Sequence, residues 1–480
     1  MLPKKKNAIY LARDASYGGG DQVLSREGIS IQDLQVNFDS RVITPEDSGY
    51  DEARTIFYGG IDRRPALIVR PVNAREVAQV IALARETGLE LAVRSGGHSF
   101  AGHSVTDGGI VLDLTNMKQL QIEVENRTAW AEAGLTAGEF TNATGEHGLA
   151  IGFGDTGSVG IGGLTLGGGV GYLVRKYGLT IDDLLAAEVV TADGQILHTD
   201  SETHPDLFWA IRGGGGNFGV ATRFQFQLHE VSTILGGMLI LPATAETIAG
   251  FIAEAEAAPD ELSTIANIMP APPMPFVPAE EHGKLIIFAF MVYAGGIEAG
   301  ERVIAPFRAL AKPIADMVKP MPYPQIYPPD EEEYHPTAVA RTMFLDRIDK
   351  DTAEVIYDTL QSSDAPVRVA QLRVLGGAMA RVPAEATAFA HRRARIMVNL
   401  AAFYTSPEDR AVREAWIADF AAAIHQGEPG AYVNFLGVEG EMRVRDAYPG
   451  LTWERLREIK ARYDPTNLFR LNHNIPPLNE

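Results

Sequence analysis

Glycine is concentrated in three short clusters, and this feature limits most strongly how the chain can fold. The clusters lie at 95–97 in RSGGHSF, at 152–171 in GFGDTGSVGIGGLTLGGGVG and at 213–219 in GGGGNFG. Glycines let a backbone approach a bulky partner closely and can aim bare N–H groups at a phosphate or a flat ring. A single cluster of this kind is typical of an ordinary turn. Three in one region predict that the backbone surrounds a ligand.

One of the clusters contains a match to a dinucleotide-binding pattern. GFGDTG (152–157) fits G-x-G-x-x-G, which in a Rossmann fold needs a strand before it and a helix that opens on its last glycine. The following SVGIGGLTLGGG has too many glycines for a helix, so we expect no Rossmann site here. The patterns typical of P-loop NTPases, zinc proteases and serine hydrolases are absent from the sequence, which disfavours those classes.

The chain between residues 67 and 115 alternates short strand and helix signals. LIVRPV (67–72) predicts a strand, and residues 74–88 predict a helix with Val77, Val80, Ile81 and Ala84 on one stripe. Residues 89–93 and 108–114 predict two buried strands. Further on, Thr136 and Glu139 form a capping-box pattern. These short mixed units favour an α+β fold over one long parallel sheet.

The composition changes after about residue 232, where two proline-rich stretches (271–281 and 319–336) predict loops or sheet edges. Between and after them, 284–295 and 394–404 predict sheet strands, whereas 246–257 and 411–424 predict helices. A length of 480 residues favours two domains. The polar, proline-containing tail is not expected to be helical.

The charge and composition of the chain limit the kinds of partner that it can bind. Acidic residues outnumber basic ones by 62 to 42, so we expect neither nucleic acid nor a membrane as a partner. The N-terminal lysines precede no apolar stretch typical of a signal peptide, and no apolar run approaches 18 residues. Cysteine is absent, which excludes disulfides and thiolate metal sites and favours a cytoplasmic protein. No metal is expected, and the oligomeric state, monomer or homodimer, stays open.

Four motifs occur in a fixed order along the chain. They are VRSGGHSF (93–100), GSVGIGGLTLGGGVGYLVRKYGLTIDDL (157–184), IRGGGGNFGVAT (211–222) and YDPTNLFRLNHNIPP (463–477). With them, residues 60–480 resemble berberine bridge enzyme-type flavoproteins of the vanillyl-alcohol oxidase (PCMH-type FAD-binding) superfamily, in the style of the bacterial 6-hydroxy-D-nicotine oxidase branch. The resemblance implies an FAD-binding domain from residues 1–232 and 431–480, with its core at about 62–232. A substrate domain of antiparallel sheet and helices is implied for residues 233–430.

The resemblance also implies a set of cofactor contacts. His98 matches the histidine that is bonded covalently to the flavin 8α-methyl group in the family. Backbone amides of two loops are implied to hold the pyrophosphate, Val220 to lie near the adenine, and two tail asparagines to lie near the flavin ring. The cofactor set is therefore His98, Arg94, Ser95, Gly96, Gly97, Ser99, Gly157, Ser158, Val159, Gly160, Gly162, Gly163, Val220, Asn472 and Asn474. Thr156 stands where some relatives carry a second, cysteinyl link, so one covalent link at most is expected.

The substrate side departs from the family pattern. Phe100, Val170 and Phe435 stand where sugar- and alcohol-oxidising relatives keep tyrosines, so a phenolate base is not expected at the usual place. Val159 falls at the family's oxygen gate, and a small valine there resembles the oxygen-reactive members. The remaining catalytic candidates are Tyr432, Asn399 and Tyr404, with His391, Tyr172 and Glu439 in segments that line the site in relatives.

These features predict an FAD-dependent oxidase with an apolar substrate pocket. It would move hydride from a C–H bond of a small molecule, amine- or alcohol-bearing, to flavin N5 and reduce O₂ to H₂O₂. One alternative is a sugar or alcohol oxidase with a relocated base. Another is a flavoprotein that guides a cyclisation without net oxidation.

Overall fold

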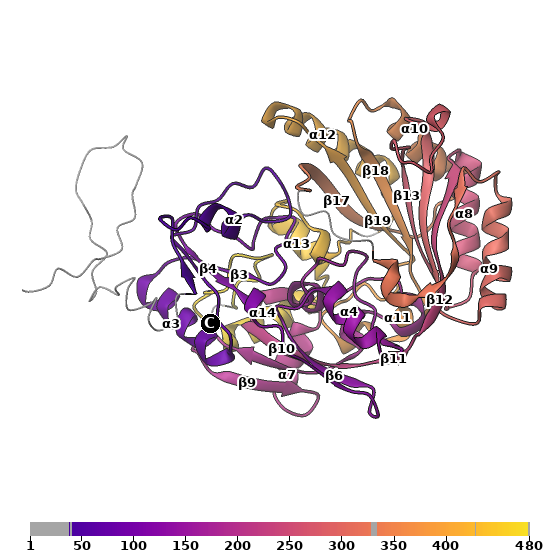
Figure 1. The fold of residues 1–480 in the computed structure, drawn as a ribbon. Coiled ribbons are helices and arrows are strands. Elements are labelled where there is room, and N and C mark those ends of the chain that lie inside the picture. Colours follow the sequence, from indigo (N-terminus) through magenta and orange to yellow (C-terminus); the bar gives the residue numbers. More distant parts are fainter. Residues whose placement is uncertain (1–37, 39–40, 328–333, 428, 479–480) are drawn as a thin grey trace, which may run out of the picture.

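The computed structural model describes residues 38, 41–327, 334–427 and 429–478 of the chain. Helices and mainly antiparallel sheets alternate within these ranges, which confirms the predicted α+β class. Two parts are visible: one carries the early and the last segments of the chain, and the other is a large sheet with helices on its outer face (Figure 1). None of the helices in the described ranges is both long and apolar enough to cross a membrane.

The first part begins with a four-stranded sheet. Its strands, in spatial order, are β1 (Val42–Ile43), β2 (Leu67–Val69), β4 (Ile110–Asp113) and β3 (Leu91–Arg94). The last three run parallel, because helix α3 (Ala74–Thr87) carries the chain from β2 back to the start of β3. The predicted apolar stripe of α3 is buried, and Gly88 ends the helix with a φ of 71°. A short helix, α2 (Tyr50–Arg54), precedes β2.

A second, antiparallel sheet completes the first part. Its strands, in spatial order, are β5 (Leu120–Glu123), β6 (Thr128–Glu132), β10 (Val220–Gln227), β8 (Leu184–Val190) and β9 (Ile196–Asp200). The pair β7 (Leu149–Ala150) and β11 (His229–Glu230) lies apart from it. The helices of this region are α4 (Ala137–Gly145), α5 (Ile161–Gly167), α6 (Val174–Tyr177) and α7 (Pro205–Ile211). The predicted capping box opens α4, since Thr136 Oγ1 accepts from the N–H of Glu139 (3.2 Å) and Glu139 accepts from the N–H of Thr136 (2.9 Å).

The expectation that residues 158–169 contain no helix is wrong. Helix α5 spans Ile161–Gly167, within the glycine-rich stretch. A glycine in a helix costs about 1 kcal/mol relative to alanine, and here that cost is offset by close packing. A Cβ on Gly162 would lie 3.1 Å from the Ser95 side chain, and one on Gly167 would lie 1.9 Å from Asn434 Oδ1. The arrangement is still not a Rossmann unit, because the preceding strand β7 pairs antiparallel with β11.

The second part is a single large antiparallel sheet. Its strands, in spatial order, are β15 (Ala315–Asp316), β12 (Thr233–Pro242), β14 (Leu285–Tyr293), β13 (Leu262–Pro270), β18 (Arg368–Val374), β19 (Ile396–Phe403) and β17 (Ala338–Leu345), with β16 (Lys319–Pro322) also paired to β12. Helices cover one face and are visible on the outer side of the sheet in Figure 1: α8 (Ala245–Ala257), α9 (Ile297–Ala309), α10 (Lys350–Ser362) and α12 (Pro407–Ile424). The opposite face is directed at the first part, where helix α11 (Gly377–Arg381) contacts α6.

The end of the chain returns to the first part through α13 (Glu441–Ala447) and α14 (Leu451–Tyr463). Trp453, Leu456, Phe469 and Ile475 join the same buried core as the first two sheets. Residues 464–478 are not helical, as predicted. In Figure 1 these yellow segments lie among the purple ones, so the early described segments and the last ones build one body.

A fully buried ion pair holds the C-terminal segment in place against the first part. Lys460 Nζ lies 2.6 Å from Asp464 Oδ2 and also donates to the carbonyl oxygens of Asn217 (2.8 Å) and Phe469 (3.0 Å). Asp464 in turn accepts from the N–H groups of Leu468 and Phe469, both at 2.8 Å. Each buried polar group therefore has partners, and the lysine joins α14 to the third glycine cluster.

We expect the substitution Lys460→Met to destabilise the fold by about 3–5 kcal/mol, because it leaves the buried Asp464 carboxylate without its cation. Urea unfolding followed by far-UV circular dichroism measures the loss. Lys350→Met is the matched control, since Lys350 pairs with Glu246 on the surface, where the two side chains are 62% and 66% exposed. That change should leave the unfolding midpoint in place. Equal effects of the two substitutions would contradict the role of the buried pair.

Candidate active site

A cavity of about 660 Å³, the inner chamber, lies between the glycine clusters and the uncovered face of the large sheet. All three clusters contribute to its wall, together with residues 432–436 and the tail at 469–473. From the sheet come Ala338, Ala340, Gln371, Arg373, Asn399 and Ala401. The chamber thus joins segments from both parts of the molecule and from both ends of the first part.

The glycine loops meet backbone to backbone at the chamber wall. A Cβ on Gly96 would lie 2.2 Å from the Gly160 nitrogen, so neither residue can carry a side chain. Ser95 Oγ donates to the Ala133 carbonyl (2.6 Å) and accepts from the N–H of Gly162 (3.3 Å). Gly163 and Gly216 also line the chamber, and a Cβ on either would meet no protein atom within 4 Å. These two positions leave space for a bound molecule.

His98 is held in the chamber wall by an aromatic neighbour. Its ring stacks on Phe57 with centroids 4.2 Å apart and planes 20° apart. Phe57 donates its backbone N–H to the Gly97 carbonyl (3.2 Å), which fixes the two segments side by side. Tyr58, next in the chain, also lines the chamber, and its ring meets Phe100 edge-on at 4.9 Å.

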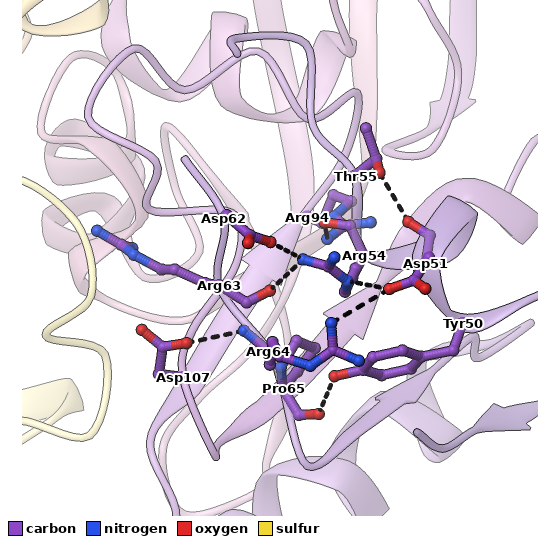
Figure 2. Close-up of polar contacts among 10 residues, drawn as sticks. All are labelled: Tyr50, Asp51, Arg54, Thr55, Asp62, Arg63, Arg64, Pro65, Arg94 and Asp107. Atoms are coloured by element: carbon purple, nitrogen blue, oxygen red, sulfur yellow. Dashed lines mark hydrogen bonds and ion pairs between the residues drawn. The ribbon is translucent and has the colours of Figure 1, made fainter. Parts of the chain in front are cut away.

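An ion-pair network around α2 anchors the segment that carries Phe57 and Tyr58 (Figure 2). Arg54 pairs with Asp51 (2.7 Å) and with Asp62, and it donates to the Arg63 carbonyl (3.2 Å). The buried Arg94 guanidinium donates to the backbone carbonyls of Ala53, Arg54 and Ser104. The side chain of Arg94 is therefore used to bind the end of α2.

The C-terminal tail closes the chamber against the third glycine cluster. Asn217 Oδ1 accepts from the N–H of Ile475 (3.0 Å), and its amide nitrogen donates to the His473 carbonyl (3.2 Å). Asn472 donates to the Gly216 carbonyl (3.3 Å), whereas the side-chain oxygens of Asn472 and Asn474 are buried without a protein partner. Buried acceptors of this kind are normally satisfied, so the oxygen of Asn472, which lines the chamber, is available to a donor on a ligand.

These features fit FAD. The glycine loops bring backbone to the chamber wall, and Gly163 and Gly216 leave room for a ligand. The side-chain oxygen of Asn472 is buried without a protein donor. Leu91, Val93, Leu114 and Val220 give one end of the chamber apolar walls, as a flat aromatic ring requires.

The sheet supplies the polar groups of the opposite wall. The Arg373 side chain is 4% exposed and pairs with Asp155, so it connects strand β18 to the second glycine cluster. It also donates to Gln371 Oε1 (2.7 Å) and to the Val170 carbonyl (3.1 Å), and its guanidinium lies 5.1 Å from the Phe435 ring centre. Asp155 carries the one carboxylate among the described residues that line the inner chamber.

Tyr432 borders the same space and is 3% exposed. Its hydroxyl oxygen accepts from the N–H of Gly169 (2.9 Å) and from Asn434 Nδ2 (3.0 Å). Burial raises the pKa of Tyr432, although the bond from Asn434 opposes the rise. The phenol is therefore protonated at neutral pH, and its oxygen is fixed by two donors.

Most of the cofactor residues predicted from the sequence come together at the inner chamber. Its lining includes His98, Ser95, Gly96, Gly97, Ser99, Val159, Gly160, Gly162, Gly163, Val220 and Asn472. Arg94 and Ser158 border a neighbouring cavity instead. Gly157 packs against Gly138 and Tyr327, and Asn474, whose side-chain oxygen is buried, is in the lining of neither cavity. Phe100, Val170 and Phe435, which stand where the family resemblance implies tyrosines, all line the inner chamber.

Of the three catalytic candidates, Tyr432 and Asn399 line the chamber and Tyr404 does not. The reason is the alternation of β19, because Asn399, Ala401 and Phe403 face the chamber and Tyr404 falls on the opposite side. Tyr404 packs against the core under the helices, with Arg410 over its ring at 5.8 Å. Tyr172, His391 and Glu439 are also outside the lining. His391 Nε2, for example, lies 2.9 Å from the Asp446 carbonyl oxygen.

Sequence reasoning missed several residues of the chamber: Tyr58, His103, Asp155, Gln371, Arg373 and His473. Three of them lie inside or beside the motifs, as His103 follows RSGGHSF, Asp155 lies in GFGDTG and His473 lies between Asn472 and Asn474. A polar residue within a glycine-rich motif was a signal that could have been used. The sequence around Gln371 and Arg373 shows only that both residues lie on the same face of a strand. It does not show which part of the molecule that face meets.

Burial of His103 and His473 makes the stability of the fold depend on pH. Their rings lie 4.9 Å apart, and burial lowers the pKa of His103 to about 3 and of His473 to about 4. In an unfolded chain a histidine titrates near pH 6.5, so the unfolded state binds protons first as the pH falls. The stability that the folded protein gains by keeping these two histidines neutral is fully present above about pH 6.5, and it is lost as the pH falls towards 4 and below.

We expect the urea midpoint of the wild-type protein to fall between pH 7 and pH 4, and to fall less in His103→Gln, which cannot be protonated there. Urea titrations at several pH values measure the difference in slope. The exposed His147 provides the control, because His147→Gln should keep the wild-type slope. A His103→Gln slope equal to the wild type would contradict the burial argument.

Family comparisons agree with the geometry of the chamber. The FAD-binding domain family matches residues 65–200, which contain the first two glycine clusters. The berberine and berberine-like family matches residues 431–476, which contain Tyr432 and the tail. The two matched segments are the ones that meet around the inner chamber.

Whole-chain comparisons extend the similarity to the large sheet. The (R)-6-hydroxynicotine oxidase of Paenarthrobacter nicotinovorans is 32% identical over 458 residues, which cover 92% of this chain and 98% of that protein. The crystal structure of 6-hydroxy-D-nicotine oxidase from Arthrobacter nicotinovorans superposes with a TM-score of 0.80 at 29% identity, covering 91% and 98% of the two chains. A chitooligosaccharide oxidase shares the fold, with a TM-score of 0.80 at 20% identity and coverage of 94% and 100%.

Motifs, chamber and whole-chain similarity agree. The chain has the PCMH-type FAD-binding fold, uses FAD as its cofactor and belongs to the berberine bridge enzyme-like family of FAD-dependent oxidoreductases.

Proposed function

We propose that this protein oxidises a small, largely apolar amine, with O₂ as the electron acceptor. Bound FAD supplies an acceptor for the hydride of the substrate C–H bond and a route by which the electrons reach O₂ to form H₂O₂. Residues 1–232 and 431–480 would hold FAD, and residues 233–430 would cover the substrate. The similarity to a nicotine oxidase supports this proposal.

The protonation states around the inner chamber are the observation that carries the choice of an amine. Burial raises the pKa of Tyr58 to about 12 and also raises that of Tyr432, so neither phenol is ionised at neutral pH. Burial lowers the pKa values of His103 and His473, which makes them weak bases. The Asp155 carboxylate is engaged with Arg373. A neutral amine needs no strong base, because its lone pair assists loss of the hydride, whereas an alcohol must lose its O–H proton as well.

The residues that line the chamber would exclude water from the reacting bond and orient the substrate. Apolar side chains such as Phe100, Phe435 and Val170 exclude water from the reacting bond, and Arg373 holds the sheet against the glycine cluster that carries Asp155. Tyr432 and Asn399 present polar atoms that can orient the substrate nitrogen. Val159 also lines the chamber, and its small side chain leaves access for O₂.

Anaerobic reduction of the purified FAD-loaded protein tests the function. We expect secondary and tertiary cyclic amines to bleach the visible flavin band and aldoses to leave it unchanged. Admission of O₂ should restore the band and release one H₂O₂ per flavin. Bleaching by aldoses alone would establish the sugar oxidase instead. Product formation without peroxide would establish a redox-neutral reaction, and failure of O₂ to restore the band would exclude an oxidase.

A single covalent link through His98 is the second element of the proposal. The ring is already positioned in the chamber wall by its stack on Phe57, and a neutral imidazole nitrogen can act as the nucleophile. We expect the yellow colour to stay with the wild-type protein after acid precipitation and to be released from His98→Ala. His103→Ala, on the same loop, should retain the link. Release of flavin from the wild type would show that FAD is bound without a covalent bond.

The alternative function is an alcohol oxidase whose base is a phenol at a new position. Tyr58 is the residue that would supply this phenol, because its ring lies against Phe100, where the family resemblance implies a tyrosine. We expect Tyr432→Phe to lower the rate of flavin reduction by tenfold or more, since it removes a fixed hydroxyl from the substrate pocket. Tyr58→Phe should have a smaller effect. Stopped-flow absorbance under anaerobic conditions measures both rates. A larger effect of Tyr58→Phe would favour the alcohol oxidase, and an unchanged rate in Tyr432→Phe would remove that residue from the mechanism.

A further inference from the structure

A second cavity of about 1250 Å³, the outer chamber, adjoins the inner one. The two share wall residues at Phe57, Ser95–His98, Thr156 and Tyr334. On one side the outer chamber is bounded by the first two glycine loops, and on the other by strands β12, β14 and β16 with the loop before β14. It therefore begins beside His98 and continues along the large sheet.

Methionine and phenylalanine side chains form the sheet wall of the outer chamber. They are Met238, Met274, Met317, Met321, Phe276, Phe288 and Phe290. Met238 and Phe290 are direct cross-strand partners between β12 and β14, so their side chains share one face. The chain has 12 methionines, and four of them are on this wall. Methionine is flexible and polarisable, and clusters of it suit variable apolar ligands.

The two arginines of the opposite wall already have partners, and Glu52 and Lys319, which also border the chamber, are exposed to solvent. Arg70 Nε lies 2.9 Å from Asp113 Oδ2, and the Arg94 guanidinium is taken up by backbone carbonyls. A ligand in the outer chamber would therefore gain its contacts mainly from the apolar wall. This chemistry favours an uncharged hydrocarbon portion over a phosphate or a carboxylate.

The volume of the inner chamber also indicates that part of the substrate lies in the outer chamber. A volume of about 660 Å³ is what one drug-sized ligand requires. FAD held by the glycine loops that border both chambers therefore leaves little of the inner chamber to a substrate. A substrate that reacts beside FAD can place only its reacting end there. Any larger portion must extend into adjoining space, and the outer chamber provides it.

We propose that the substrate is elongated, with its reacting amine end in the inner chamber and an apolar extension of several carbons in the outer chamber. This inference rests on the proposed amine oxidation for the identity of the reacting end. Met238, Met321 and Met274 are then specificity-determining residues that contact the extension.

Calorimetric titration with n-alkylamines, from butylamine to octylamine under anaerobic conditions, tests the proposal. The FAD of the loaded protein is reduced with dithionite beforehand, so that it cannot accept a hydride and only binding is measured. Burial of each added methylene contributes about 0.8 kcal/mol, so affinity should rise about fourfold per carbon. The double substitution Met238→Gln and Met321→Gln keeps side-chain length but adds polarity, and should flatten this dependence. Butylamine binding should be unchanged in the variant. Met442→Gln, at a 75% exposed position on α13 outside both chambers, should behave as the wild type.

Met274→Gln alone provides a variant that leaves the sheet strands intact, because Met274 lies on the loop before β14 and is 37% exposed. It should reduce the dependence on chain length in part. Affinity that does not change with alkyl length in the wild type, or the same dependence in the double variant, would overturn the proposal. The titration uses reduced FAD and is therefore independent of the bleaching experiment. Length-dependent affinity together with no bleaching by any amine would refute only the proposed oxidation.

Discussion

The contact between the first two glycine loops is the constraint on which the rest of the structure depends. At Gly96 and Gly160 the two backbones are so close that neither position has room for a Cβ. This contact places Ser95, Gly162 and the start of α5 beside His98, and it fixes the separation between the first sheet and the second. The helix α5 exists in a glycine-rich segment because tertiary packing offsets its poor helix propensity. Room for a large cofactor follows from the same lack of side chains.

The third glycine cluster depends on the far end of the chain. Lys460 reaches from α14 to the Asn217 carbonyl, and Asn217 in turn binds the tail at His473 and Ile475. The cofactor site is therefore assembled from segments more than 350 residues apart, and the large sheet is inserted between them. Arg373 completes the assembly from the sheet by pairing with Asp155. The chamber exists only when both parts of the molecule are in place.

Much of the cofactor side could be predicted from the sequence, because its signals are local. Glycine clusters, the histidine in RSGGHSF and the polar tail are contiguous motifs, and most of their members line the inner chamber. The substrate side was harder to predict, because its residues come singly from different strands. Tyr404, a predicted catalytic residue, directly follows β19 and lies away from the chamber, whereas Gln371 and Arg373 of β18, which no motif indicates, line it. Strand alternation gives two faces, and only the neighbouring part of the structure decides which one meets the cofactor.

By itself, the sequence determined the α+β class, the presence of a glycine framework suited to surrounding a ligand, the position of His98 and the apolar residues Phe100, Val170 and Phe435 at places where the family resemblance implies tyrosines. Each of these is a property of a residue type at a position in a motif. Only the tertiary structure decided that Arg373 and Asp155 meet, that Tyr432 is held by Gly169 and Asn434, and that a methionine-lined chamber adjoins the cofactor site. These are contacts between distant segments, and their energies depend on burial and geometry that no local pattern contains.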